Sequence, residues 1–328
     1  MDRIAFIIGE TFVFWSPIIL SLAALSAACV FLALYLGKGG GVVGGFAAVP
    51  LSVVLSMVLG RIIHWYCRTD YYESFTAAVT DYSSGGYALV GVFAGCILTA
   101  CLLRLIRASK SLPHMLDCMS LAGAVGICAG RMSHMFGVLD HGDVLEGITQ
   151  LPIAHGVANT VSGELEYRLA TFMLQSIAAG VIFVILLAFW ITGKRRRGDT
   201  CLLFLLFYGV SQIVLDSTRY DSLFLRSNGF VSIVQILSAV AVVLAIVVFS
   251  VRLVQNMGWR YWFLALWIPI LGLLGGAGYM EYYVQRHGNE AAFAYSVMSA
   301  CLLLVVVFAL VIRGLAVHAQ KKKQLVNA

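Results

Sequence analysis

Long apolar stretches separated by short polar segments dominate the chain. A helix needs about 20 apolar residues to cross a hydrocarbon core of ~30 Å. Runs of this kind occur nine times, at 12–36, 42–60, 86–106, 115–136, 170–192, 201–216, 230–251, 261–282 and 293–313. The run at 201–216 is the shortest of them. The pattern predicts nine transmembrane helices and an all-α polytopic membrane bundle.

Composition agrees with this interpretation. The 328 residues are 61% hydrophobic and 12% charged, and the mean hydropathy is +0.92. A soluble domain of this length cannot bury that much apolar surface. We therefore expect one integral membrane domain over 1–328, without a soluble module.

The distribution of charge predicts the topology. With nine spans, one side of the membrane collects 14 of the 22 basic residues. The two longest loops of the other side, 61–84 and 137–167, hold eight of the 16 acidic residues. Because positive loops stay in the cytoplasm, the N-terminus is expected outside and the C-terminus inside. The net charge of +6 is then a topological feature and not evidence for a nucleic-acid partner.

The cysteines and histidines give no metal pattern. The eight cysteines include no Cys-x-x-Cys pair and are expected to act as small apolar packing residues. An external string, Asp140-His141-Gly142-Asp143, is followed by His155, but this spacing matches no strong ligand pattern. The sequence therefore predicts neither a metal nor a cofactor.

Glycines on two of the predicted spans indicate close helix packing. Gly91 and Gly95 are four residues apart on the third span, and Gly126 and Gly130 are four apart on the fourth. Small residues at this spacing allow helix backbones to approach closely in lipid. Both helices are expected to pack tightly against a neighbour.

Polar residues gather toward the outer ends of four predicted spans. An arginine at this depth is costly and usually faces a partner inside the protein. One explanation is a set of interhelical salt bridges, such as Arg131 with Asp216. The other is a shared polar cavity, open to the outer leaflet, that holds a lipid head group. The residues concerned are His64, Ser84, Gly85, Gly86, Arg131, His134, Tyr208, Gln212, Asp216 and Arg219.

The order of several short motifs resembles a known family. The chain carries Leu-Pro-His-Met-Leu-Asp at 112–117, Gly-Arg-x-Ser-His-x-Phe at 130–136, Phe-Met-Leu-Gln-Ser-Ile at 172–177 and Tyr-Gly-x-x-Gln-x-x-x-Asp-x-x-Arg at 208–219. From about residue 45 to 250 it resembles the prolipoprotein diacylglyceryl transferases. The resemblance implies a family-type bundle of about seven helices over 12–254. Residues 255–328 then add two helices and a basic cytoplasmic tail.

The resemblance also assigns residues. Arg131 matches the family arginine of the Gly-Arg motif, and His134 stands where the family has asparagine. Tyr208, Asp216 and Arg219 match residues on the sixth span. The sequence departs from the family pattern at Gln212, where the family has arginine, and at Ser84, where it has histidine. Gln175 replaces a glutamate, and Asp140 is the acidic residue nearest to the one that follows the Gly-Arg motif in the family.

The implied activity transfers diacylglyceryl from phosphatidylglycerol to the lipobox cysteine of a prolipoprotein, at the outer side of the bacterial inner membrane. His134, Arg131 and Tyr208 are the expected catalytic residues, with His134 as the substitute base. The expected substrate-binding residues are Ser84, Gly85, Gly86, Gln212, Asp216, Arg219 and His64. Two alternatives stay open: a relative that binds phospholipid without transfer, and a small membrane transporter or sensor.

Overall fold

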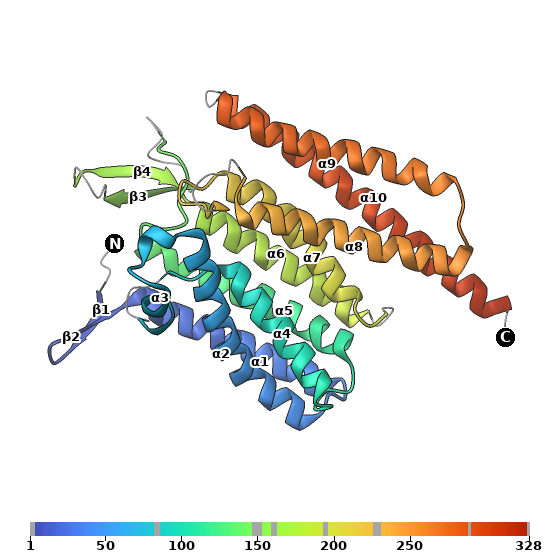
Figure 1. Ribbon diagram of the computed structural model, residues 1–328, viewed down its shortest axis with the longest axis horizontal. Helices are drawn as coiled ribbons and strands as arrows, with labels where there is room; N and C mark the ends of the chain where they lie inside the picture. Colours follow the sequence, from blue (N-terminus) through green and yellow to red (C-terminus); the bar gives the residue numbers. More distant parts are fainter. Residues whose placement is uncertain are drawn as a thin grey trace. The chain divides into compact units, whose positions relative to one another are not determined.

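The computed structural model describes residues 4–81, 86–145, 153–158, 163–192, 196–225, 231–287 and 290–326, and most of them are helical (Figure 1). This confirms the predicted all-α polytopic bundle. Eight helical spans in this part of the chain are long and apolar enough to cross a membrane. They are α1 (Trp15–Gly37), α2 (Val42–Cys67), α5 (Leu112–Arg131) with the 3-10 helix η2 (Met132–Phe136), α6 (Thr171–Ile191), α7 (Asp199–Ser217), α8 (Ile233–Met257), α9 (Trp262–Arg286) and α10 (Ala291–Val326).

The remaining predicted span, the third at 86–106, is α4 (Leu89–Leu105), an apolar helix of 17 residues. A length of about 17 residues is the lower limit for crossing a bilayer. The span predicted at 201–216 is longer than expected, because α7 begins at Asp199 and ends at Ser217, giving 19 residues.

Several helix ends differ from the sequence prediction, among them the start of α1 and the end of α2. Helix α1 begins three residues later than expected because residues 11–14, rich in β-branched and aromatic side chains, form a strand. This strand, β2 (Thr11–Phe14), pairs with β1 (Ile4–Ile8) across a turn in which Gly9 has φ of 61°. Helix α2 continues seven residues beyond its predicted end, to Cys67.

The chain folds into two compact units. The first unit comprises Met1–Phe204 and Thr218–Val234, and the second comprises Leu205–Ser217 and Gln235–Ala328. Helix α7 therefore contributes its first turns to one unit and the rest to the other. The division predicted from the sequence, after residue 254, stays a prediction.

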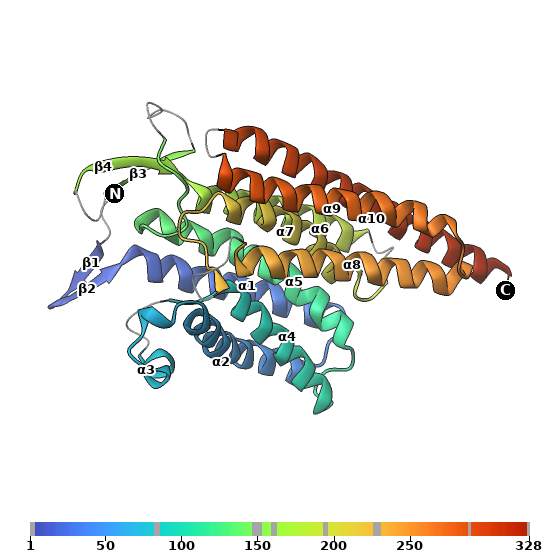
Figure 2. The ribbon, with the colours of Figure 1, turned by 45° about the horizontal axis from the view of Figure 1, so that its top comes forward.

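Helix packing in the first unit depends on the predicted glycine pairs. A Cβ atom on Gly91 would lie 2.4 Å from the Gly60 backbone, and one on Gly95 would lie 2.5 Å from the backbone nitrogen of Ser56. Helices α2 and α4 are thus in backbone contact (Figure 2). Gly126 similarly brings α5 against Ala27 of α1, at 3.1 Å. The expected close packing of both helices is confirmed.

A buried carboxylate orders the start of α7 in the first unit. Asp117 on α5 is 1% exposed, and it accepts hydrogen bonds from the backbone nitrogens of Gly198 (2.7 Å) and Cys201 (2.8 Å). The first N–H groups of a helix have no partner within the helix and favour a negative charge. Asp117 supplies both the acceptor and the charge.

Short elements outside the long helices complete the first unit. Strands β3 (Ala154–Ala158) and β4 (Leu165–Leu169) form an antiparallel pair in which Gly156 lies opposite Tyr167. A 3-10 turn, η1 (Thr69–Tyr71), and the helix α3 (Phe75–Thr80) follow α2. These elements lie on the side of the unit where α2 and α5 end, and they frame the polar residues described below.

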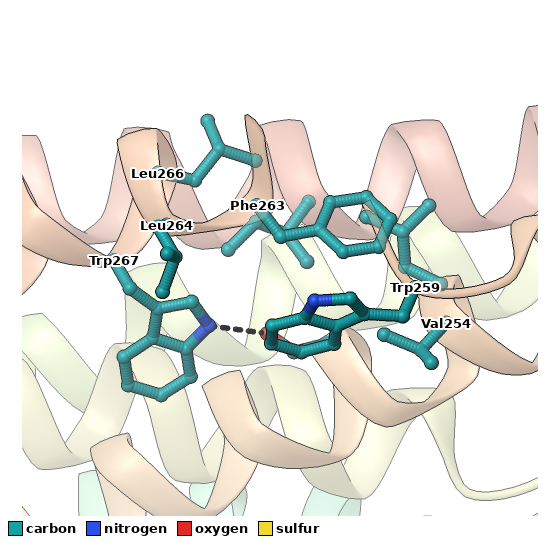
Figure 3. A pocket seen from close by; sticks show the side chains of 9 residues that line it. Val254, Trp259, Phe263, Leu264, Leu266 and Trp267 are labelled. Carbon is teal, nitrogen blue, oxygen red and sulfur yellow. Dashed lines mark hydrogen bonds between the residues drawn. The ribbon is translucent and has the colours of Figure 1, made fainter. Parts of the chain in front are cut away.

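The second unit joins part of α7 to α8, α9 and α10. Gly209 of α7 packs on α8, where an added Cβ would lie 2.9 Å from the carbonyl oxygen of Ser238. Helices α9 and α10 run side by side (Figures 1 and 2). A small apolar pocket lies where α8 meets α9, and there the Trp267 indole donates to the Ser250 hydroxyl at 3.2 Å (Figure 3). The pocket is lined by Ser250, Leu253, Val254, Trp259, Phe263, Leu264, Leu266, Trp267 and Ile312.

The contact between α2 and α4 allows a direct prediction about the stability of the protein. Gly91→Ala should destabilise the protein by about 1–3 kcal/mol, because the new methyl group meets backbone that can yield only if the helices separate. Thermal unfolding of the purified protein measures this. Gly123→Ala is the matched control, since an added Cβ on Gly123 meets no atom within 4 Å. Equal melting temperatures for the two variants would contradict the proposed contact.

Candidate functional site

Three of the residues singled out in the sequence meet at one carboxylate. The Asp140 side chain forms ion pairs with Arg131, at the end of α5, and with Arg219, just after α7. The imidazole Nε2 of His134 on η2 lies 3.1 Å from Asp140 Oδ2. The Asp140 side chain is 3% exposed, and each arginine side chain is 11% exposed. We call these four residues the Asp140 cluster.

Local helix geometry positions Arg131 and His134 in the cluster. Arg131 is the last residue of α5 and not an interior residue, because the chain tightens there into the 3-10 helix η2. The Ser133 hydroxyl, which is buried, donates to the carbonyl oxygen of Gly130 at 2.7 Å. This bond satisfies one of the carbonyl groups left open at the helix end.

Backbone hydrogen bonds also hold Asp140 in place. Its φ of 59° lies in the left-handed region, where aspartate is one of the few non-glycine residues found. Its N–H donates to Asp221 Oδ2 at 3.0 Å, and its carbonyl oxygen accepts from the N–H of Phe172 at 2.9 Å. Asp140 thereby connects the loop after η2 to α6 and to the segment after α7.

Charge in this region is balanced. Arg219 Nε also donates to Asp221 Oδ1 at 3.0 Å, so two guanidinium groups face two carboxylates. Burial raises the pKa of Asp140, but the charges of Arg131 and Arg219 outweigh burial and hold that pKa well below its usual range. Asp140 is therefore a carboxylate at neutral pH. As an acceptor it fixes the orientation of both arginines.

A second cluster surrounds the end of α2. The fully buried Arg61 donates to the carbonyl oxygens of Ala78 (2.7 Å), Gly86 (3.0 Å) and Asp81. Its guanidinium carbon lies 4.8 Å from the centre of the Tyr72 ring. The Arg61 side chain thus holds the backbone of the loop after α2. We interpret the role of Arg61 as structural.

His64 and Gly86 belong to this second cluster. The Tyr72 hydroxyl lies 2.8 Å from His64 Nδ1 and 3.3 Å from the carbonyl oxygen of Gly86. Gly86 has φ of +81°, and a Cβ there would lie 2.7 Å from the Tyr72 oxygen, so the position requires glycine. Ser84 and Gly85, predicted with them as substrate-binding residues, lie outside the residues that the structure describes.

The remaining predicted site residues lie on α7 in the second unit. Tyr208, Gln212 and Asp216 are 6%, 1% and 1% exposed. They are four residues apart and so share one face of the helix. The prediction that they share one cavity with His134 and Gly86 stays a prediction.

The two loop histidines also meet. His141 Nδ1 lies 2.9 Å from the carbonyl oxygen of Leu139, which only accepts, so that nitrogen carries the proton. His141 Nε2 then accepts from His155 Nδ1 at 3.0 Å. Burial lowers the pKa of both histidines, so the pair is neutral at pH 7. We interpret the histidine pair as a structural contact that packs the loop carrying Asp140.

Sequence reasoning missed the acidic partners of the two arginines. The sequence places Asp140 in an external Asp-His-Gly-Asp string and as the acid nearest to the family position, and it does not single out Asp221. Neither residue lies in a span, so hydropathy gives no reason to select it. The acid that follows the Gly-Arg motif was the one available clue.

The comparisons with known proteins agree with the motifs. The family model described as prolipoprotein diacylglyceryl transferase matches residues 3–251. The phosphatidylglycerol–prolipoprotein diacylglyceryl transferase of Bacillus cereus (strain B4264) is 27% identical over 265 residues, which cover 77% of this chain and 92% of that protein. The protein of the same name from Finegoldia magna is 26% identical over 249 residues, covering 73% and 94%. This chain belongs to the prolipoprotein diacylglyceryl transferase family.

Proposed function

We propose that this protein transfers the diacylglyceryl group of phosphatidylglycerol to the lipobox cysteine of a prolipoprotein in the bacterial inner membrane. Family membership and the substrates named in the relatives support this activity. The observation that carries it in the structure is the pairing of Arg131 and Arg219 on one buried carboxylate. Two fixed guanidinium groups suit a reaction whose leaving group is a phosphate.

The arginines would bind that phosphate. Each guanidinium has five N–H donors in a planar fork, more than a single carboxylate accepts. Asp140 sets the direction of both forks, so the positive charge is in place before the reaction begins. Preorganised charge of this kind, in a site that excludes water, stabilises a developing anion.

His134 would act as the base. With Asp140 accepting from Nε2, the imidazole keeps the lone pair of Nδ1 for a proton. The cysteine thiol gives that proton to His134, and its sulfur forms a bond to the glyceryl carbon. The bond from this carbon to the phosphate oxygen breaks, and glycerol phosphate leaves beside Arg131 and Arg219. An orienting carboxylate behind a histidine base is a recurrent arrangement.

The proposed site faces the outside of the cell. The basic residues concentrate on the opposite side, which supports a cytoplasmic C-terminus and an external N-terminus. Exported prolipoproteins arrive at the outer face, and the acyl chains of the lipid remain in the bilayer throughout the reaction.

The activity itself is tested by lipidation of a lipobox-bearing prolipoprotein in cells depleted of their own transferase, and by transfer with purified components. Arg131→Lys should lower the transfer rate by about 10²–10³-fold, because a point charge cannot reproduce the two-pronged contact with phosphate. The exposed Arg104, on α4, provides the control Arg104→Lys, which should keep the wild-type rate.

The same assay distinguishes the alternative of a lipid-binding relative. If the folded wild-type protein transfers nothing but binds phosphatidylglycerol, and Arg131→Ala abolishes that binding, the transferase proposal fails. If the folded protein neither transfers the diacylglyceryl group nor binds phosphatidylglycerol, both functions are contradicted. That result would favour a transporter or sensor.

The role of His134 has its own test. His134→Ala should reduce the transfer rate by about 10²–10⁴-fold, the usual contribution of a general base, with little change in phosphatidylglycerol binding. Initial rates across a pH series measure the loss, and His287→Ala, which removes an exposed histidine, is the control. A His134→Ala variant that retains the wild-type rate and pH profile would exclude His134 as the base.

A further inference from the structure

A buried carboxyl lies on a helix beyond the family match. Glu281 belongs to α9, whereas the family model ends at residue 251. Glu281 is 7% exposed, and its Oε2 atom has no hydrogen-bond partner among the residues that the structure describes. Ionisable side chains within membrane helices are costly and usually mark a function.

Polar groups from other helices of the second unit surround Glu281. The side chains of Ser217, Gln235 and Gln285 lie next to its carboxyl, and Asp216 is close enough to act on it electrostatically. Tyr295 of α10 donates to the carbonyl oxygen of Ser217 at 3.1 Å. These residues come from the end of α7, the start of α8, the end of α9 and the start of α10. The polar groups therefore gather at one end of the second unit.

The amide of Gln235 also bonds to the backbone of α7. Its Nε2 donates to the carbonyl oxygen of Ile213 at 3.1 Å. No lysine, arginine or histidine is among the described groups that act on the Glu281 carboxyl. A second negative charge, on Asp216, is among them. An ionised Glu281 would thus be a buried anion that has only neutral polar side chains and a second carboxyl near it.

Two nearby carboxyls in an apolar environment do not both ionise. Leaving a charged oxygen buried without a partner costs more than neutralising it with a proton. A metal cation would require a shell of several oxygen ligands, whereas a proton requires one carboxyl. We propose that Glu281 and Asp216 form a membrane-embedded proton-binding site, in which Glu281 holds the proton at neutral pH.

This site adds a chemical group that the family match does not include. Its Asp216 lies on α7 together with Tyr208 and Gln212, so the proposed proton site adjoins the helix that carries these predicted site residues. The proposal does not depend on transferase activity, and its test does not measure that activity.

Dicyclohexylcarbodiimide tests the proposal in the purified full-length protein. This apolar reagent takes the proton of a carboxylic acid, forms a bond between the carboxyl oxygen and its central carbon, and rearranges to a stable N-acylurea. Peptide mass spectrometry should find the adduct on Glu281 at about pH 7. The exposed Glu290 should remain unmodified as an internal control, and Glu281→Gln should remove the adduct.

Asp216→Asn tests whether the two carboxyls are coupled. Without the second negative charge, Glu281 should ionise more readily, and the pH of half-maximal modification should fall by about one unit or more. Gel filtration checks that the variant is folded. If it is not, the wild-type modification profile between about pH 5 and 9 and the sodium competition below decide the question.

Three results would overturn the proposal. The first is folded wild-type protein without an adduct on Glu281 at about pH 5–7. The second is an unchanged pH profile in folded Asp216→Asn. The third is protection of Glu281 by sodium chloride relative to choline chloride at constant pH, which would identify a metal-cation site instead.

Discussion

The end of the first unit at which α5 ends depends on the ion pairs of Asp140 with Arg131 and Arg219. A buried guanidinium is costly unless a partner compensates its charge. Here Asp140 pairs with both guanidinium groups, and Asp221 gives Arg219 a second carboxylate. Because Arg131 ends α5 and Arg219 follows α7, the contact fixes two chain segments that are distant in the sequence. The loop that carries Asp140 is held in turn by Asp221 and by the backbone of Phe172.

The ion pairs at Asp140 serve both the stability of the fold and the proposed chemistry. A cation that is held rigidly for stability is also a preorganised charge for an anionic substrate. Asp140 pairs with the imidazole of His134 as well, so the proposed proton acceptor and the two proposed phosphate-binding groups share one support. The cluster around Arg61 differs, because Arg61 donates to backbone carbonyl oxygens and fastens a loop. Burial alone therefore does not separate a structural arginine from a functional one.

The features predicted correctly from the sequence are those that depend on hydropathy and on the spacing of small residues. All nine spans correspond to helices, and Gly91 and Gly95 lie where α2 and α4 touch. Motif order selected Arg131, His134 and Arg219, which the structure brings together. It could not select Asp140, because a loop aspartate in the left-handed region leaves no periodic pattern. Glu281 was missed for a related reason: one acid near the end of an apolar helix resembles an interfacial residue until its neighbours are known.

A double-mutant cycle between Asp140 and Arg219 tests the central claim most directly. The free energy of unfolding is measured for the wild type, Asp140→Asn, Arg219→Gln and the double variant. Each single change should cost about 3–5 kcal/mol, because it leaves a buried charge uncompensated. The double variant should be more stable than the sum of the two losses predicts, by at least about 1 kcal/mol. Losses that simply add would show that the two residues act independently and would contradict the account.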